Sequence, residues 1–296
     1  MHRSVAYKQI YDVSIVVPIY NGERYIETKL KSLTGVEGVK YEVIIALNRC
    51  TDRSEELIRV YGRGIKNLSV IRHSSFLESG KNFQSGVLAA SGDYIFVSAI
   101  DDICDKEFYR EAIEILKSKN SACAISPMSR YENNSHGNTP IDFELTGSTE
   151  NRIETLFDNI RVSHGIFYSL IKREVAISLY KNFATDYAIT GGDWLFNLKL
   201  ALNGEVLRAR ESYCTFGVRG ISRKENYLTT SGTSWTTRVF PYAILCREIL
   251  KLAGGREKSL KSLFLKIVIR LLYGNLHRYL TFLKLSMLQH ELRRHL

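Results

Sequence analysis

The chain has 296 residues, of which 45% are hydrophobic, and carries a formal net charge of +10. This profile predicts a globular protein with one large domain, with or without an appendage, and excludes a low-complexity or fibrous chain. The five cysteines are odd in number and form no Cys-x-x-Cys pair, so neither a disulfide framework nor a zinc site is predicted and a reducing, cytoplasmic location is favoured. No apolar run reaches about 18 residues, so we expect no membrane span.

The basic charge is concentrated at the C-terminal end. Residues 256–296 contain nine Lys or Arg against Glu257 and Glu291, which accounts for +7 of the net +10. Such an excess predicts an anionic partner: nucleic acid, a membrane surface or a phosphorylated small molecule. A nucleic-acid-binding face would interleave basic and aromatic residues across a domain. Because the excess is confined to the end of the chain, we expect no nucleic-acid partner.

The first third of the sequence predicts strands that alternate with helices. Short β-rich runs predict strands over 13–20, 41–47, 68–73 and 93–99, and helical spacing or capping residues predict helices between them. This order is typical of a mostly parallel sheet with helices on both faces, which binds ligands beyond the carboxyl ends of its strands. Polar or aromatic residues stand at or just past these ends, namely Tyr20, Asn48, His73, Asp101 and Asp102.

After residue 120 the alternation weakens. The patterns predict a strand over 121–128, a loop over 130–150, a helix over 151–160, a strand followed by a short helix over 162–179, and a helix over 191–203 that Gly204 caps. The weakly periodic run 217–236 suggests a loop over the site. We predict a catalytic domain over 1–240, with halves at about 1–110 and 120–240, and a basic helical tail over 241–296.

In that tail, apolar residues recur at helical spacing in two groups (Leu260, Leu263, Phe264, Ile267, Leu271; then Leu276, Leu280, Leu283, Met287), with Gly274–Asn275 between them. Two amphipathic helices with basic faces fit an anionic membrane surface. A helical hairpin that packs on the catalytic body, or that forms a dimer, fits the pattern equally well. All three alternatives stay open at the level of sequence.

Adjacent carboxylates end the predicted strand over 93–99. Like charges so close repel each other, so Asp101 and Asp102 need a compensating partner. A strand-end turn is one explanation, because Asp is common in turns. A divalent cation that arrives with a phosphorylated substrate is the other.

Several motifs, in this order and spacing, resemble glycosyltransferase family 2, which has the GT-A fold. They read "VSIVVPIYNGERYIETKLKSL", "YEVIIALNRCTDRSEEL" and "GKNFQSGVLAASGDYIFVSAIDD", and later "GIFYSLIKREV" and "GGDWLFNLKLALNG". The resemblance implies a Rossmann-like, mostly parallel sheet and an inverting, metal-dependent transfer of a sugar. The donor would be a nucleoside-diphosphate sugar, with UDP favoured. The acceptor would be a hydroxyl of a glycan or lipid-linked molecule in surface polysaccharide or lipopolysaccharide synthesis.

The resemblance also implies a donor site. Asp102 and Asp101 match metal positions for Mg²⁺ or Mn²⁺, Asp101 also matches a ribose position, and Ala99 stands where the family usually has another acid. Tyr20 matches the residue that stacks on the base, and Asn48 stands where an Asp commonly reads uracil. Two further nucleotide-site candidates are Asp52, for which helix capping is an equal explanation, and Lys81, which could equally be a surface group.

On the acceptor side, the resemblance implies that Asp193 is the catalytic base, with helix capping as the alternative. Trp194 would stack on an acceptor sugar or belong to the core, and His164 would line the cleft or serve a structural role. Arg219 and Arg223 would clamp the diphosphate or lie solvated in a loop.

Two other readings of the function remain. A sugar nucleotidyltransferase would usually have a Gly-rich basic loop near the N-terminus, which "VPIYNGERYI" provides poorly. A catalytically degenerate relative is kept open by Ala99.

The expected location depends on the tail. The protein is expected to be cytoplasmic, and peripheral on the inner face of the cytoplasmic membrane if the tail binds lipid. A homo-oligomer follows if the tail dimerises.

Overall fold

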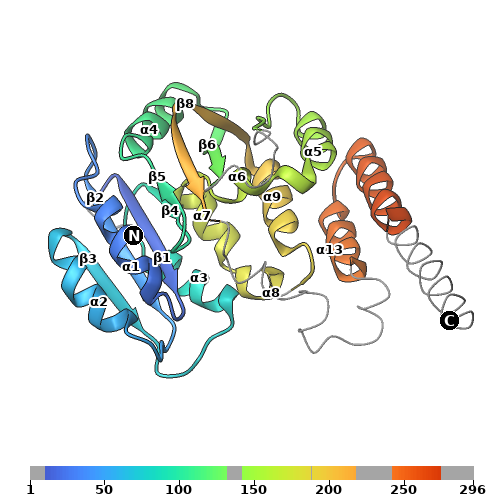
Figure 1. The fold of residues 1–296 in the computed structure, drawn as a ribbon. Helices are drawn as coiled ribbons and strands as arrows, with labels where there is room; N and C mark the ends of the chain where they lie inside the picture. The colour runs from blue at the N-terminus through green and yellow to red at the C-terminus, as the bar shows by residue number, and fades with distance from the viewer. Residues whose placement is uncertain (1–10, 132–141, 188, 218–241, 275–296) are drawn as a thin grey trace, which may run out of the picture.

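The computed structural model describes residues 11–131, 142–187, 189–217 and 242–274 (Figure 1). Its N-terminal part alternates strands and helices as predicted: β1 (Val13–Ile19), α1 (Glu23–Leu33), β2 (Tyr41–Leu47), α2 (Ser54–Tyr61), the short 3-10 helix η1 (Gly62–Gly64), β3 (Leu68–Arg72), α3 (Ser79–Leu88) and β4 (Tyr94–Val97). The four predicted strands are therefore confirmed.

The elements that follow are less regular. They are β5 (Ile103–Cys104), α4 (Phe108–Ser118), β6 (Ala122–Tyr131), α5 (Thr149–Asp158), the 3-10 helix η2 (Ile160–Val162), α6 (His164–Phe167), β7 (Leu170–Lys172), α7 (Arg173–Tyr180), α8 (Phe183–Tyr187), α9 (Gly192–Asn203), β8 (Glu205–Phe216), α13 (Ala243–Ala253) and a helix over 258–274.

The strands form one sheet in the order β3-β2-β1-β4-β7-β6-β8-β5. β3, β2, β1 and β4 are parallel, and so are β6 and β8, whereas β7 is antiparallel to both of its neighbours and β5 is antiparallel to β8. The mostly parallel sheet flanked by helices is thus confirmed. The sequence patterns assign no element to β8, because the charged residues of "EVLRARESYCTF" hide the alternation of a strand.

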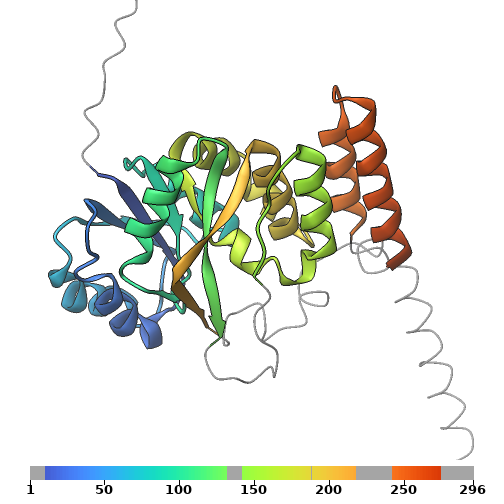
Figure 2. The same cartoon turned by 90° about the horizontal axis from the view of Figure 1, so that it is seen from above.

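Both faces of the sheet are buried, which explains the continuous apolar runs of its strands. Along β1, Ile15 and Val17 pack on the side covered by α1, α2 and α4, while Val16 faces the side that α3, α5, α9 and α13 cover. Figure 2 shows these helices lying on opposite sides of the sheet. The polar edge at the strand ends is therefore the part of the sheet left for a ligand.

The C-terminal helices pack on the body. Leu245 and Ile249 of α13, and Phe264 and Ile267 of the helix over 258–274, join the same apolar cluster as Leu198 of α9. Within the described residues, the first apolar group of the predicted tail is therefore a packing face. The second group, Leu276 to Met287, lies outside the described residues.

A pair of neighbouring residues tests this packing. Phe264 is fully buried, whereas Leu265 is 52% exposed on the same helix. We expect Phe264→Ala to lower the free energy of unfolding by about 3–4 kcal/mol, and Leu265→Ala to change it by less than about 0.5 kcal/mol. Urea denaturation measures both, and equal losses would contradict the packing of this helix on the body.

Candidate active site

The end of β1 carries an exposed pair of aromatic rings. Ile19 lies opposite Leu47 in the parallel pairing of β1 with β2, so Tyr20 and Asn48 follow at the same edge of the sheet. The rings of Tyr20 and Phe76 meet edge to face, with their centroids 5.0 Å apart. Both side chains are exposed, Tyr20 by 42% and Phe76 by 56%. Such a pair offers an apolar platform on which a nucleobase can stack.

Asn48 holds the loop that carries Phe76. Its Nδ2 donates to the Leu77 carbonyl at 2.7 Å, and its Oδ1 accepts from the Leu77 N–H at 2.8 Å. The side chain is buried, so its first role in the structure is to fix this loop against the end of β2. Reading of a base edge by the remaining amide hydrogen and lone pair stays a prediction.

Asp52 ties together the loops after β1 and β2. Its Oδ2 accepts from the Glu23 N–H and its Oδ1 from the Ser54 N–H, both at 3.0 Å. In return, Glu23 Oε2 accepts from the Arg53 N–H at 2.9 Å. Burial tends to raise the pKa of Asp52, but the hydrogen bonds from Ser54 and Glu23 lower it below its usual value. These contacts support the capping explanation, and a contact with nucleotide stays a prediction.

Asp101 and Asp102 flank the backbone of one glycine just after β8. Asp102 Oδ1 accepts from the Gly217 N–H at 3.0 Å. A side chain at Gly217 would clash with the Asp101 carboxylate, so only glycine allows this approach. Asp102 is 4% exposed, and its Oδ2 accepts no hydrogen bond from the described residues. Burial, with repulsion from Asp101, raises the pKa of Asp102 to about 7.

The compensating charge for these acids is a buried lysine. Lys29 of α1 is 1% exposed, and its Nζ donates to Ser98 Oγ and to the Asp102 carbonyl, both at 2.5 Å. Burial lowers the pKa of Lys29, while nearby groups that include Asp102 and Asp101 oppose that shift. The side chain thus fixes the turn that presents both carboxylates. In the sequence, Lys29 looks like an ordinary polar position of an amphipathic helix.

The donor set fits a divalent cation in chemistry. Among the described residues no group of three or more His, Cys, Asp and Glu gathers, and Asp101 and Asp102 are the described side chains that would serve as ligands. Mg²⁺ and Mn²⁺ sites of transferases commonly have few protein ligands, with substrate phosphate and water completing the shell. The buried Oδ2 of Asp102, which has no hydrogen-bond donor in the described chain, is a suitable ligand.

Asp193 lies in the first turn of α9. The helix begins after Gly191, whose φ of +80° favours glycine and whose lack of a side chain lets Leu245 of α13 pack against it. Burial raises the pKa of Asp193, and hydrogen bonds from its own backbone and that of Trp194 only partly oppose this. A part-buried carboxylate with a raised pKa is suited to accept a proton near neutral pH.

Beside Asp193, Trp194 lines a pocket of about 530 Å³. Its ring stacks on Tyr242 with centroids 5.1 Å apart, and Val162, Ile267 and Leu271 add apolar walls. Arg161 and Arg270 lie in the same lining, from η2 and from the helix over 258–274. Both predicted roles of Trp194 are therefore compatible with the structure, because it packs on the core and also faces a cavity.

His164 lies close to the acidic pair. Its ring meets those of Tyr168 and Phe216 edge to face, with centroids 4.9 and 4.7 Å away, and Phe216 directly precedes Gly217. Asn197 of α9 holds the preceding turn by donating to the Ser163 carbonyl at 3.0 Å. The structure therefore brings His164 and the Asp101–Asp102 pair to the same end of β8.

The remaining candidates are Lys81, the pair Arg219 and Arg223, and His73. Lys81 is exposed in the first turn of α3, and its proposed contact with phosphate stays a prediction. Arg219 and Arg223 lie outside the described residues, as does most of the loop predicted over 217–236. His73, at the end of β3, bonds through its Nε2 to Ser85 Oγ at 3.0 Å, which gives it a structural partner.

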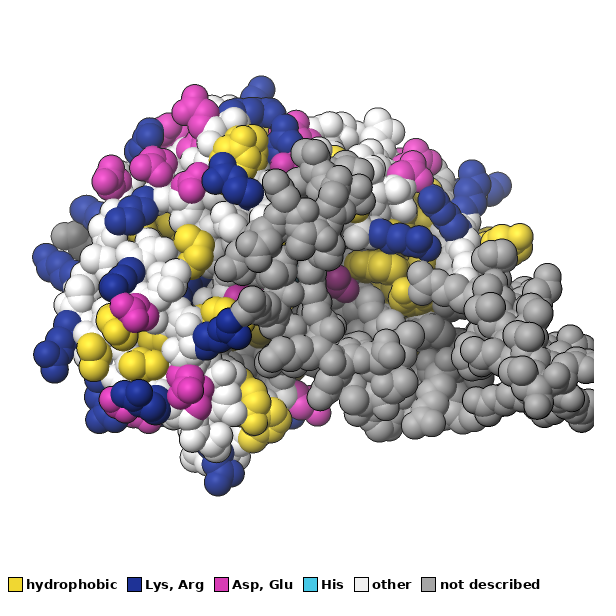
Figure 3. Space-filling model, viewed as in Figure 1, with side chains coloured by type: hydrophobic (Ala, Val, Ile, Leu, Met, Phe, Trp, Pro, Cys, Tyr) yellow, Lys and Arg dark blue, Asp and Glu magenta, His cyan; other side chains and the backbone are white. Residues whose placement is uncertain are grey.

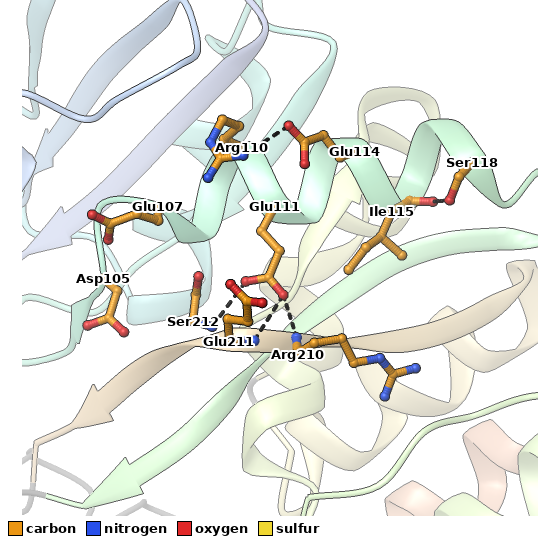
Figure 4. A pocket seen from close by; sticks show the side chains of 10 residues that line it. All are labelled: Asp105, Glu107, Arg110, Glu111, Glu114, Ile115, Ser118, Arg210, Glu211 and Ser212. Carbon is orange, nitrogen blue, oxygen red and sulfur yellow. Dashed lines mark hydrogen bonds and ion pairs between the residues drawn. The ribbon is translucent and has the colours of Figure 1, made fainter.

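A larger acidic pocket, of about 600 Å³, lies between α4 and β8 (Figure 4). Figure 4 shows Glu111 reaching from α4 to β8, where it accepts from the backbone N–H groups of Arg210, Glu211 and Ser212. The pairing of β8 with β6 is irregular at these residues, so their N–H groups need another acceptor. The pocket thus lies where Glu111 of α4 holds the irregular part of β8.

The fold is an α/β fold with a polar and aromatic site at the carboxyl ends of its parallel strands. The sequence model of Glycosyl transferase family 2 matches residues 14–179, and the chain belongs to this family. It is similar to the abequosyltransferase RfbV of Salmonella typhimurium, with 34% identity over 99 residues, and to the uncharacterized glycosyltransferase EpsJ of Bacillus subtilis, with 35% over 100 residues. These matches span 32–33% of the chain and under a third of either relative, 29% and 28%.

Solved structures support the GT-A fold over a larger part of the chain. TarS of S. aureus, in complex with UDP-GlcNAc, aligns with a TM-score of 0.61 at 19% identity, over 86% of this chain and 72% of that one. The mannosyltransferase PcManGT of Pyrobaculum calidifontis, in complex with GDP-Man and Mn²⁺, aligns with a TM-score of 0.53 at 14% identity, over 94% and 80%. At these identities the likeness concerns the fold.

The sequence reading missed Phe76, Lys29 and Gly217. Phe76 follows β3 in a polar loop that has no periodic signal, and Gly217 lies at the start of a weakly periodic run. A lysine between Thr28 and Leu30 carries no signal of burial. Only the spacing of Lys29 from the buried Leu33, four residues later, places it on the apolar side of α1.

The role of Lys29 can be tested by its stability effect. Lys29→Met keeps most of the buried volume but leaves the Ser98 hydroxyl and the Asp102 carbonyl without their donor, and we expect a loss of about 2–4 kcal/mol in the free energy of unfolding. Lys31→Met, on the exposed face of the same helix, is the control and should leave the urea midpoint unchanged. Equal midpoints for the two variants would refute the structural role of Lys29.

Proposed function

We propose that the protein is an inverting, metal-dependent glycosyltransferase that moves a sugar from a nucleoside-diphosphate sugar to an acceptor hydroxyl. The observation that carries the proposal is the meeting of the Tyr20–Phe76 platform and the Asp101–Asp102 pair at one sheet edge in a family 2 fold. In this arrangement residues 1–110 form the donor half, and residues 120–240 form the acceptor half. The tail begins at about residue 241.

On the donor side, the base stacks on Tyr20 and Phe76, and Asn48 and Asp52 order the loops around it. UDP is the favoured nucleotide because TarS, a fold relative, binds UDP-GlcNAc. Asn48, which stands where the family commonly has an Asp that reads uracil, still offers an acceptor and a donor to a base edge. Asp101 and Asp102 would hold Mg²⁺ or Mn²⁺, and PcManGT, another fold relative, was solved in complex with Mn²⁺. The cation would supply positive charge for the leaving diphosphate. Lys81, Arg219 and Arg223 add to it.

The proposed transfer is a single displacement at the anomeric carbon. The acceptor oxygen bonds to the anomeric carbon from the face opposite the diphosphate, while the bond from that carbon to the diphosphate oxygen breaks and its electron pair leaves with the diphosphate. The hydroxyl proton passes to the Asp193 carboxylate. Inversion follows because attack and departure occur on opposite faces. The raised pKa of Asp193 suits it to hold the proton after transfer.

On the acceptor side, the pocket that Trp194 lines receives the sugar that carries the accepting hydroxyl. His164, which packs on Phe216 next to Gly217, is a further candidate contact for the acceptor. Surface polysaccharide or lipopolysaccharide synthesis is the favoured process, because the chain is similar to an abequosyltransferase, RfbV. Such acceptors are commonly carried on lipids, which would place the protein at the inner face of the cytoplasmic membrane. No described helix is long and apolar enough to cross a membrane.

Replacement of the proposed base tests the reaction. Asp193→Asn removes the proton acceptor but retains the shape of the side chain, so we expect transfer to fall by at least about 100-fold while binding of the donor nucleotide is unchanged. A screen of UDP-, GDP- and dTDP-sugars with Mg²⁺ or Mn²⁺ identifies the donor, and calorimetry with the nucleotide measures binding. Wild-type rates in both Asp193→Asn and Asp102→Ala would overturn the assignment.

The pH dependence provides a second test of Asp193. The base acts only when ionised, so kcat/KM falls as the pH drops through its pKa, and burial raises that pKa. We therefore expect the acid limb of the pH profile to lie above the range of an ordinary aspartate. An acid limb at the usual aspartate value would show that Asp193 is not the titrating base.

A further inference from the structure

The helix over 258–274 has a second apolar face, opposite the one that packs on the body. Four large side chains on it are exposed: Leu265 by 52%, Ile269 by 57%, Leu272 by 40% and Tyr273 by 71%. Their spacing of four, seven and eight residues places them within about 100° of one another around the helix. Single exposed apolar residues are common on protein surfaces, but a contiguous stripe indicates an interaction site.

This stripe is accessible at one end of the molecule. The helix over 258–274 lies outside α13 and farthest from β3 in both views (Figures 1 and 2). Figure 3 shows hydrophobic side chains next to Lys and Arg at this end of the surface. The stripe is therefore presented outward from the catalytic body.

Basic residues border the stripe. Residues 258–274 contain Lys258, Lys261, Lys266 and Arg270 and no acid. Arg270 pairs with Asp158 of α5, whereas Lys258, Lys261 and Lys266 form no ion pair with the described residues. Around the helix, Lys261 lies on one side of the stripe and Lys266 on the other. Long lysine stems can follow an apolar surface while their charges remain at headgroup level.

We propose that the stripe Leu265–Ile269–Leu272–Tyr273 docks in the plane of an anionic lipid surface, with Lys258, Lys261 and Lys266 contacting the headgroups. An apolar centre with lysines on both borders has the chemistry of an interfacial helix, and the absence of acid from 258–274 gives the matching charge. For the first apolar group of the tail, this assignment takes the place of the membrane-facing alternative, because Leu260, Leu263, Phe264 and Ile267 are buried against the body.

The docking would also bring the acceptor pocket to the membrane. Ile267, Arg270 and Leu271, on other sides of the same helix, line the cavity that contains Trp194. A helix that lies at headgroup level on its outer face thus places this cavity beside the lipid surface. The inference deepens the membrane location in the proposed function, and it identifies the surface that makes the contact.

Vesicle binding by the full chain tests the docking. We expect wild-type protein to co-float with vesicles of phosphatidylglycerol and phosphatidylcholine in equal amounts, and to bind pure phosphatidylcholine at least about tenfold more weakly. The double variant Leu265→Gln/Ile269→Gln should reduce binding to the anionic vesicles at least about tenfold. Lys261→Gln/Lys266→Gln should remove most of the difference between the two lipids.

The matched control is Val60→Gln, because Val60 is 51% exposed on α2, near the opposite end of the sheet. This variant should bind vesicles like the wild type. Hydrolysis of the donor sugar in solution should be unchanged in the stripe, lysine and Val60 variants. Asp193→Asn should still bind vesicles. A failure of docking can therefore be distinguished from a failure of the transferase assignment. Equal binding of Leu265→Gln/Ile269→Gln and Val60→Gln would overturn the inference. A wild-type dimer that the stripe variants dissociate would do so as well.

Discussion

The buried ammonium of Lys29 is the contact on which the candidate active site depends. It bonds Ser98 at the end of β4 and the Asp102 carbonyl, and thereby fixes the turn from which Asp101 and Asp102 project. Two adjacent carboxylates would otherwise repel each other in a partly buried position. The Lys29 side chain under the turn, and the Gly217 N–H on Asp102, hold the two residues in place.

At the predicted nucleotide side, hydrogen bonds between loops hold the backbone in place. Polar side chains of the loops after β1 and β2 bond to each other's backbone, as in the reciprocal contacts of Asp52 with Glu23 and of Glu23 with Arg53. Asn48 extends the network to the loop that bears Phe76. These bonds occupy N–H groups near the starts of α1 and α2 and fix the loops on either side of the Tyr20–Phe76 pair.

The helix over 258–274 shows how one amphipathic segment can serve two surfaces. Its inner face completes the core around α9 and α13, and its outer face carries an apolar stripe between lysines. Sequence periodicity detected the inner face and left three roles open for it: the membrane, packing on the body, and a dimer. Packing on the body is the role that the structure gives this face, and the proposed lipid contact belongs to the opposite side of the same helix.

The sequence by itself determined the parallel half of the sheet, the family, and the order of Tyr20, Asn48 and Asp101–Asp102 along the strand ends. These features follow from local patterns: β-rich runs, helical spacing and short motifs. Only the tertiary structure decided that Lys29 is buried, that Phe76 packs against Tyr20, and that Gly217 lies against Asp101 and Asp102. Gly217 and Asp102 are 115 residues apart in the sequence. Helical spacing places Lys29 on the apolar side of α1, but the contacts that all three residues make join segments distant in sequence, and no local pattern indicates them. The same holds for β8, whose backbone N–H groups bond to Glu111 of α4. Periodicity also indicates the inner face of the helix over 258–274, but only the tertiary structure shows that it packs around α9 and α13.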